Sequence, residues 1–119
     1  MSNASSWDVL SASTITGDKV VNATGDELGK IEDIMIDLER GRISYAVLSF
    51  GGFLGMGDKF FAIPWDALTV DKVNKCVRLD VSKEKLESAP GFDKDNWPKD
   101  SDPSFVPGIY EYYGTSQYW

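Results

Sequence analysis

The chain has 119 residues, with 12 Lys and Arg, 19 Asp and Glu and no His, so its net charge is −7. This length suits one globular domain, and an acidic surface without a basic cluster argues against binding to nucleic acid or to an anionic membrane. A single cysteine, Cys76, excludes an intrachain disulfide and fits a reducing cytoplasm.

Residues 1–8 are expected to form a flexible N-terminus, in which Ser2, Asn3 and Ala4 resemble a remnant of cloning. They lack the basic start and apolar run of a secretory signal. The longest uncharged stretch, residues 43–57, is too short for a membrane span of about 20 residues and is interrupted by glycines. We therefore expect no membrane span and a cytoplasmic location.

The first strands are predicted at residues 19–22 and 27–39, joined by a turn at residues 23–26. Gly25 gives this turn access to positive φ at no steric cost. A hairpin connection follows at residues 38–42, with Gly41 at its positive-φ position.

The second of these strands has a break in its alternation. Ile34, Ile36 and Leu38 share one face, but Ile31 is out of phase with them. Either a β-bulge at residues 32–33 restores the phase, or Ile31 faces outward; we favour the bulge.

The strand at residues 43–50 is apolar on both faces, which indicates that both faces are covered. The cover of its second face is either another subunit or the C-terminal tail. The side chains fall into two sets: Ile43, Tyr45 and Val47 on one face, and Ala46, Leu48 and Phe50 on the other.

A glycine-rich loop at residues 51–59 carries three apolar side chains, Phe53, Leu54 and Met56, which are typical of a protein contact. The strand after it, residues 60–63, ends at Pro64, because proline cannot donate to a sheet. Trp65 then begins a tight turn and is expected to close one end of the core.

The last hairpin is predicted at residues 69–71 and 76–81, with Val77, Leu79 and Val81 facing inward. Ser82 is predicted to cap a short helix at residues 83–88.

From residue 89 to the end the chain is rich in proline and aromatic residues. Proline favours extended or turn geometry, whereas so many aromatic side chains argue against disorder. We expect residues 89–119 to form an extended tail that docks through its aromatic side chains on the domain or on a partner.

Four short motifs, in this order and spacing, resemble the PRC-barrel family over about residues 9–86. They are Gly25-x-x-Leu28-Gly29-Lys30-Ile31, Ile34-x-Ile36-Asp37, Gly41-Arg42-Ile43-x-Tyr45 and Ala62-Ile63-Pro64-Trp65. The start, Leu10-Ser11-Ala12-Ser13, and the tail motif, Gly91-Phe92-x-x-x-Asn96-Trp97-Pro98, are similar to free-standing bacterial members.

The resemblance implies a mainly β fold at residues 9–88: a small, strongly bent antiparallel β-barrel with one short helix. Relatives include the cytoplasmic domain of the photosynthetic reaction centre H subunit, which supports proton delivery to a quinone. Another is the C-terminal domain of a ribosome-maturation factor, which contacts a ribosomal protein. The chain lacks the membrane helix of the first and the RNA-associated domain of the second.

No motif for catalysis or cofactor binding is complete. The glycines at residues 52–57 have phosphate-loop spacing, but Asp58 stands where lysine is required. Asp93 and Asp95 begin a calcium-loop pattern that Trp97 and Pro98 interrupt. Without histidine the usual catalytic triads cannot form.

Two further groups have a structural interpretation. Four carboxylates could relay protons but are expected to pair with nearby Lys30, Arg40 and Arg42: Glu32, Asp33, Asp37 and Asp66. Cys76 is expected to be a half-buried structural cysteine. We therefore expect no enzyme, no metal and no cofactor.

The sequence favours a non-enzymatic interaction or regulatory module that forms a homodimer and binds an unidentified protein. The alternatives are an accessory protein that docks peripherally on a membrane electron-transfer complex and, third, a ribosome assembly factor without direct nucleic-acid contact. The candidate interface residues are Tyr45, Leu48, Phe50, Phe53, Leu54, Met56, Trp97, Tyr110, Tyr112 and Tyr113.

Overall fold

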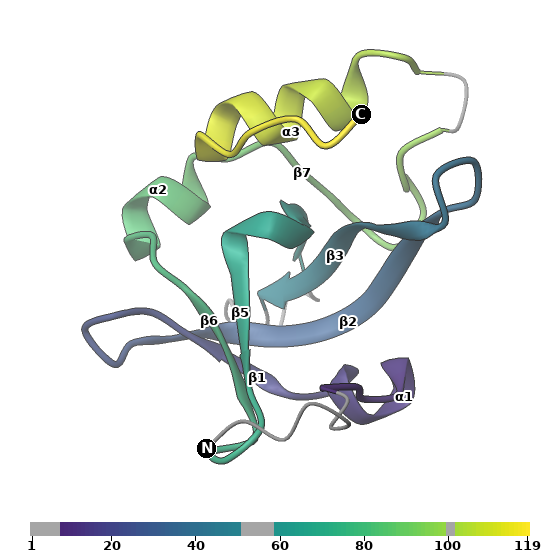
Figure 1. Ribbon diagram of the computed structural model, residues 1–119. Coiled ribbons are helices and arrows are strands. Elements are labelled where there is room, and N and C mark those ends of the chain that lie inside the picture. Colours follow the sequence, from purple (N-terminus) through teal and green to yellow (C-terminus); the bar gives the residue numbers. More distant parts are fainter. Residues whose placement is uncertain (1–7, 51–58, 100–101) are drawn as a thin grey trace.

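The fold is one open, seven-stranded β-sheet with three short helices, seen in a computed structural model that describes residues 8–50, 59–99 and 102–119 (Figure 1). The strand order is β5-β6-β1-β2-β3-β4-β7. The strands are β1 (Lys19–Val21), β2 (Glu27–Asp37), β3 (Arg42–Phe50), β4 (Lys59–Pro64), β5 (Leu68–Asp71), β6 (Cys76–Leu79) and β7 (Gly91–Phe92). The helices are α1 (Ala12–Ile15), α2 (Lys83–Glu87) and α3 (Phe105–Tyr113), with a 3₁₀ turn, η1 (Trp65–Ala67).

The mainly β character is confirmed, but the sheet differs from the expected antiparallel barrel. Within the described residues β5 and β7 are the two edges and do not pair with each other, so the sheet is open. One neighbouring pair, β1 and β6, is parallel. Three helices replace the single one that the sequence predicted.

The predicted bulge in β2 is confirmed. The register between β2 and β3 shifts between Ile31 and Asp33, and both Ile31 and Ile34 are buried. A second shift lies between Met35 and Ile36. This shift places its extra residue, Ser44, in β3 and leaves the alternation of β2 unchanged. Of the three residues predicted to share one face, Ile34 is buried, whereas Ile36 near the end of β2 is 53% exposed and Leu38 in the following turn is 90% exposed.

The main core lies between the two halves of the curved sheet. Its buried side chains come mainly from β1, β2, β3, β4 and β6, and α1 and α2 add Ile15 and Leu86. Trp65 packs partly buried against this core, as predicted for the corner after Pro64. Ser82 caps α2 as predicted, because its Oγ accepts a hydrogen bond from the Lys85 N–H at 3.0 Å.

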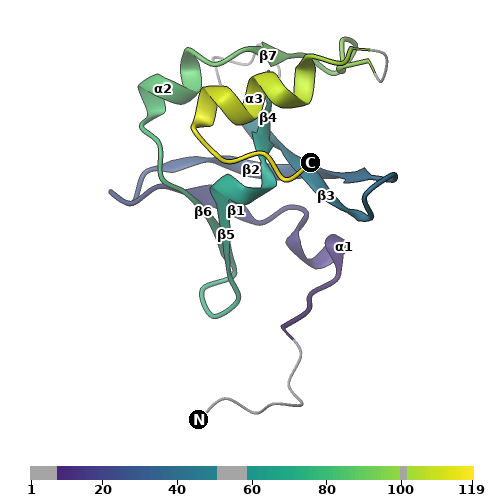
Figure 2. The same cartoon turned by 45° about the horizontal axis from the view of Figure 1, so that its top comes forward.

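The tail packs on the body of the protein, and part of it is helical, where the sequence predicted an extended tail. Residues Phe105–Tyr113 form α3, which lies over β4 (Figure 2). Pro107 is tolerated because it is the third residue of α3, where a backbone N–H has no intrahelical acceptor. Gly114 ends the helix in the left-handed region with φ of 72°, and the chain then returns along α3 (Figure 1).

The apolar spacing of Phe105, Ile109 and Tyr113, four residues apart, was the helical signal in the tail. The prolines of the tail, which favour extended or turn geometry, were the basis for predicting an extended chain in spite of this helical spacing.

No helix in the described ranges combines the length and hydropathy that crossing a bilayer requires.

Candidate functional site

The second face of β3 and β4 is covered by the chain's own tail. A smaller core forms there, in which Ile109 and Tyr110 of α3 pack with Tyr45, Val47 and Phe60. Of the two covers that the sequence allowed for β3, the C-terminal tail is therefore the one found. Tyr110 is only 1% exposed, so this contact is part of the protein interior.

Three tyrosine hydroxyls attach the tail to the body of the protein. Tyr110 Oη donates a hydrogen bond to the Ser44 carbonyl oxygen at 2.6 Å, and this bond is buried. Tyr118 Oη donates to Asp37 Oδ2 at 2.7 Å, and Tyr112 Oη donates to the Lys85 carbonyl oxygen at 2.6 Å. These bonds fix the tail at β3, at the end of β2 and at α2.

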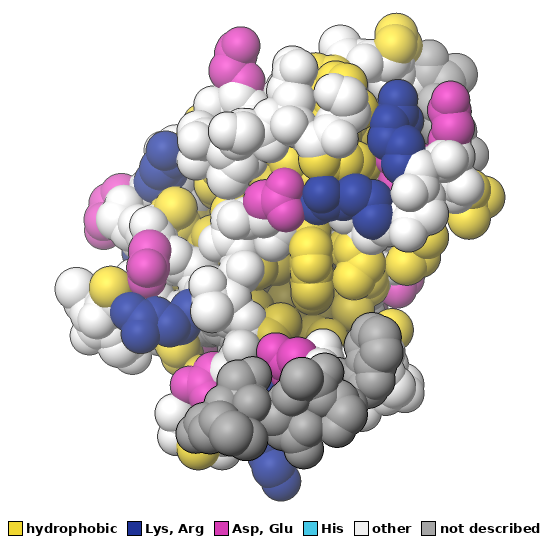
Figure 3. All heavy atoms as spheres, viewed as in Figure 1, with side chains coloured by type: hydrophobic (Ala, Val, Ile, Leu, Met, Phe, Trp, Pro, Cys, Tyr) yellow, Lys and Arg dark blue, Asp and Glu magenta, His cyan; other side chains and the backbone are white. Residues whose placement is uncertain are grey.

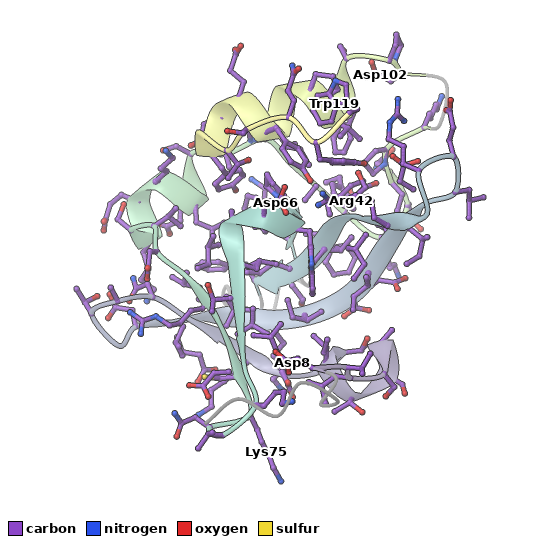
Figure 4. All side chains as sticks on the ribbon, viewed as in Figure 1. Asp8, Arg42, Asp66, Lys75, Asp102 and Trp119 are labelled. Atoms are coloured by element: carbon purple, nitrogen blue, oxygen red, sulfur yellow. The ribbon has the colours of Figure 1, made fainter. Side chains whose placement is uncertain are left out.

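Arg42 links the tail to the turn after β4. Its guanidinium lies 3.8 Å from the centroid of the Tyr118 ring, and its Nη2 is 2.9 Å from Asp66 Oδ1. Figure 4 shows Arg42 and Asp66 pointing toward each other. Of the four carboxylates expected to pair with Lys30, Arg40 and Arg42, two do so among the described residues: Asp66 with Arg42, and Asp37 with Arg40, whose Nη1 lies 3.3 Å from Asp37 Oδ2.

The contact between Tyr118 and Asp37 contributes to a shift in the pKa of each side chain. The hydrogen bond that Tyr118 donates lowers the pKa of the Asp37 carboxyl, and bonds from Arg40 lower it further. Burial raises the pKa of Tyr118; the nearby Ser44 hydroxyl lowers it and the Asp37 carboxylate raises it. Asp37 is therefore held ionised and Tyr118 neutral, which preserves their bond.

The candidate interface residues have three different positions. Leu48 lies in the main core, and Tyr45 and Tyr110 lie in the smaller one, so these three do not form an exposed surface. Four are partly buried at the edges of the two cores: Phe50, Trp97, Tyr112 and Tyr113. Phe53, Leu54 and Met56 lie outside the described residues.

An apolar surface that the sequence analysis did not single out lies between β3, η1 and β5. Figure 3 shows hydrophobic side chains gathered there, below the charged pair that Figure 4 labels as Arg42 and Asp66. We call this surface the apolar patch and define it by four partly buried side chains that pack on the main core: Ile43, Trp65, Leu68 and Val70. Its signal was the set of apolar residues that follow Pro64, of which only Trp65 was predicted to pack on the core.

A cavity of about 450 Å³ lies between the end of the β2–β3 hairpin and the tail. Its walls are mainly apolar and include Met35, Tyr45, Phe105 and Val106. Six polar side chains also line it: Asp37, Arg40, Ser44, Lys99, Asp102 and Tyr118. The sequence did not predict this cavity, because its walls come from segments that only the folded tail brings together.

The four carboxylates considered for proton relay do not form one group. Asp37 and Asp66 have separate cationic partners, and in the described part of the chain no three side chains of the metal-binding types gather at one place. Cys76 is buried at the start of β6.

The model of the PRC-barrel domain family matches residues 8–86, a region that includes α1, all strands from β1 to β6 and most of α2. No curated protein sequence matches the chain. The matched region contains six of the seven strands and nearly all of the main core, whereas β7, α3 and the docked tail lie beyond it. By this match over most of its length, the chain belongs to the PRC-barrel family.

Proposed function

We propose that this chain is a non-enzymatic protein-interaction module that forms a homodimer through the apolar patch. The observation that carries the proposal is that the patch stays partly exposed although the tail covers the other apolar face of β3. Apolar surface of this kind, bordered by charged side chains, is typical of protein contacts.

The position of β5 supports the same surface. Among the described residues β5 pairs only with β6, so one edge of β5 has no strand beside it. Leu68 and Val70 of the patch belong to this strand. A second copy related by a two-fold axis would place β5 against β5 and cover both patches with each other.

Charge supports a self-complementary contact. Arg42 and Asp66 lie at the border of the patch, and both side chains are partly exposed. In a two-fold contact the Arg42 of each copy would approach the Asp66 of the other, so each patch carries the charge that its counterpart needs. In the cytoplasm, where we propose that the protein works, the Cys76 thiol would stay reduced.

Sedimentation equilibrium of the wild type and of Val70→Glu tests this proposal. At about 100 μM we expect a reversible dimer for the wild type and a monomer for Val70→Glu, because the new charge would have to lose its water in the contact. The matched control is Val73→Glu in the turn after β5, where the side chain is 89% exposed; this variant should dimerise like the wild type.

Circular dichroism would show that Val70→Glu is folded. A wild type that is strictly monomeric at this concentration contradicts the dimer, and a folded Val70→Glu variant that still dimerises removes the patch from the contact.

Docking on a membrane electron-transfer complex, the alternative suggested by the reaction-centre H subunit, would use the same patch with a different partner. Co-purification from native membranes separates the two. A quinone-dependent complex recovered with the wild type but not with Val70→Glu would replace the homodimer as the function.

A further inference from the structure

We propose that the cavity between the β2–β3 hairpin and the tail binds a small aromatic carboxylate. This inference is independent of dimerisation, because the cavity is lined by Ser44, Lys99, Phe105 and their neighbours and by none of the patch residues. Its volume of about 450 Å³ lies within the range of small-molecule sites, and its mainly apolar and aromatic walls suit the body of an aromatic ligand.

Ser44 supplies a polar side chain at the wall of the cavity. It lines the cavity and is only 5% exposed, yet its Oγ has no hydrogen-bond partner within the described structure. The nearby Tyr118 hydroxyl donates its proton to Asp37, so it could only accept from Ser44; the two hydroxyls are close enough to influence each other, but their geometry does not make a hydrogen bond. A buried hydroxyl without a partner is costly, and a ligand oxygen would satisfy it.

The acidic side chains of the cavity are already engaged. Asp37 accepts hydrogen bonds from Tyr118, from Arg40 and from the backbone N–H of Glu39. Asp102 accepts two from Ser104, through its N–H at 3.0 Å and its Oγ at 2.7 Å. Each of the two carboxylates thus already accepts hydrogen bonds from the chain itself, which favours a ligand that brings acceptors of its own.

The groups still available are donors. Lys99 is exposed and forms no ion pair with any residue that the structure describes. The first turn of α3, residues 105–107, lines the cavity, and no side chain caps this end of the helix. The positive end of a helix dipole and an ammonium group both favour an anion.

Asp102 opposes this preference, because its carboxylate lines the same cavity (Figure 4). The negative charge of Asp102 makes it possible to test whether the ligand is an anion or a cation. If the ligand is an anion, neutralising Asp102 should tighten binding and neutralising Lys99 should weaken it; a cationic ligand would reverse both effects.

The experiment is an NMR titration of the ¹⁵N-labelled full chain with 1-naphthoate, and in parallel with 1-naphthylmethanol and 1-naphthylmethylamine. We expect saturable shifts at residues 44–45 and 105–107 with 1-naphthoate, and affinity about tenfold weaker for the amine. Lys99→Gln should weaken 1-naphthoate about twofold to fivefold and Asp102→Asn should tighten it by a similar factor, as for exposed charge pairs.

Ser44→Ala should weaken 1-naphthoate about threefold or more, since it removes the buried donor. Lys94→Gln, an exposed lysine outside the cavity, is the matched control and should leave the affinity unchanged. If Ser44→Ala does not fold, the affinities of the Lys99→Gln and Asp102→Asn variants for 1-naphthoate test the proposal by themselves. The proposal is overturned if 1-naphthoate gives no saturable shift, if the amine binds equally well, or if both charge variants bind like the wild type.

Discussion

Gly29 lies where β2 passes close to β3 and adopts φ of 148°, a conformation that side chains disfavour. A Cβ at this position would overlap the carbonyl oxygen of Ser49 and press against the Leu48 side chain. Because this oxygen is part of the backbone of β3, a central strand, it cannot move aside without breaking the sheet. The glycine of the Leu28-Gly29-Lys30 motif is therefore required by a close approach of two strands.

Gly29→Ala should lower the free energy of unfolding by roughly 2–4 kcal/mol, which combines backbone strain with displacement of β3. Gly108→Ala is the control, because a Cβ at Gly108 meets open space within α3 and should stabilise the helix by up to about 1 kcal/mol. Urea unfolding measures both. A Gly29→Ala variant within about 0.5 kcal/mol of the wild type would contradict the close approach.

At the scale of elements, α3 is held by packing and by one buried hydrogen bond. Tyr110 is central to this contact, because its ring lies in the smaller core and its hydroxyl donates to the Ser44 carbonyl oxygen. Its ring also meets those of Tyr118 and Trp119, with centroids 5.6 Å and 5.1 Å away. Burial raises the pKa of Tyr110 from 10.0 to about 12, and the charge of Asp66 contributes in the same direction.

Tyr110→Phe should lower the free energy of unfolding by about 0.5–1.5 kcal/mol at neutral pH. The raised pKa means that the stabilisation is fully present below pH 10.0 and is lost as the pH rises toward about 12, because only the unfolded phenol ionises in that range. The difference between the wild type and Tyr110→Phe should therefore shrink between these pH values.

Urea unfolding across this pH range checks the Tyr110 prediction. Tyr112→Phe is the control, because its hydroxyl bond to the Lys85 carbonyl oxygen is exposed. A Tyr110→Phe difference that stays constant from pH 10.0 to about 12 would contradict the raised pKa.

At the scale of the whole molecule, the sequence predicted what local patterns determine. The strands from residue 19 to residue 79, the bulge beside Ile31, the corner at Pro64 and the Ser82 cap all follow from side-chain alternation and turn residues. The positive φ of Gly41, which is 66°, was likewise predicted from a local pattern, the hairpin turn at residues 38–42.

What long-range packing determines could not be predicted in this way. The parallel pairing of β1 with β6 joins segments more than 50 residues apart, and no local pattern encodes it. The cavity and the apolar patch each need several segments in their final positions. The exposure of Ile36 depends on how far the core extends along β2, which side-chain alternation does not show.

The tail closes one apolar face of β3 within the chain, and we propose that, among the described residues, the apolar patch is the face that a second copy covers. Hydrogen–deuterium exchange at low and high protein concentration tests it most directly. We predict that amides of η1 and β5, residues 65–71, become more protected at high concentration, while those of β3 at residues 45–48 and of α3 stay equally protected. Protection that rises in α3 instead, or nowhere, would contradict the account.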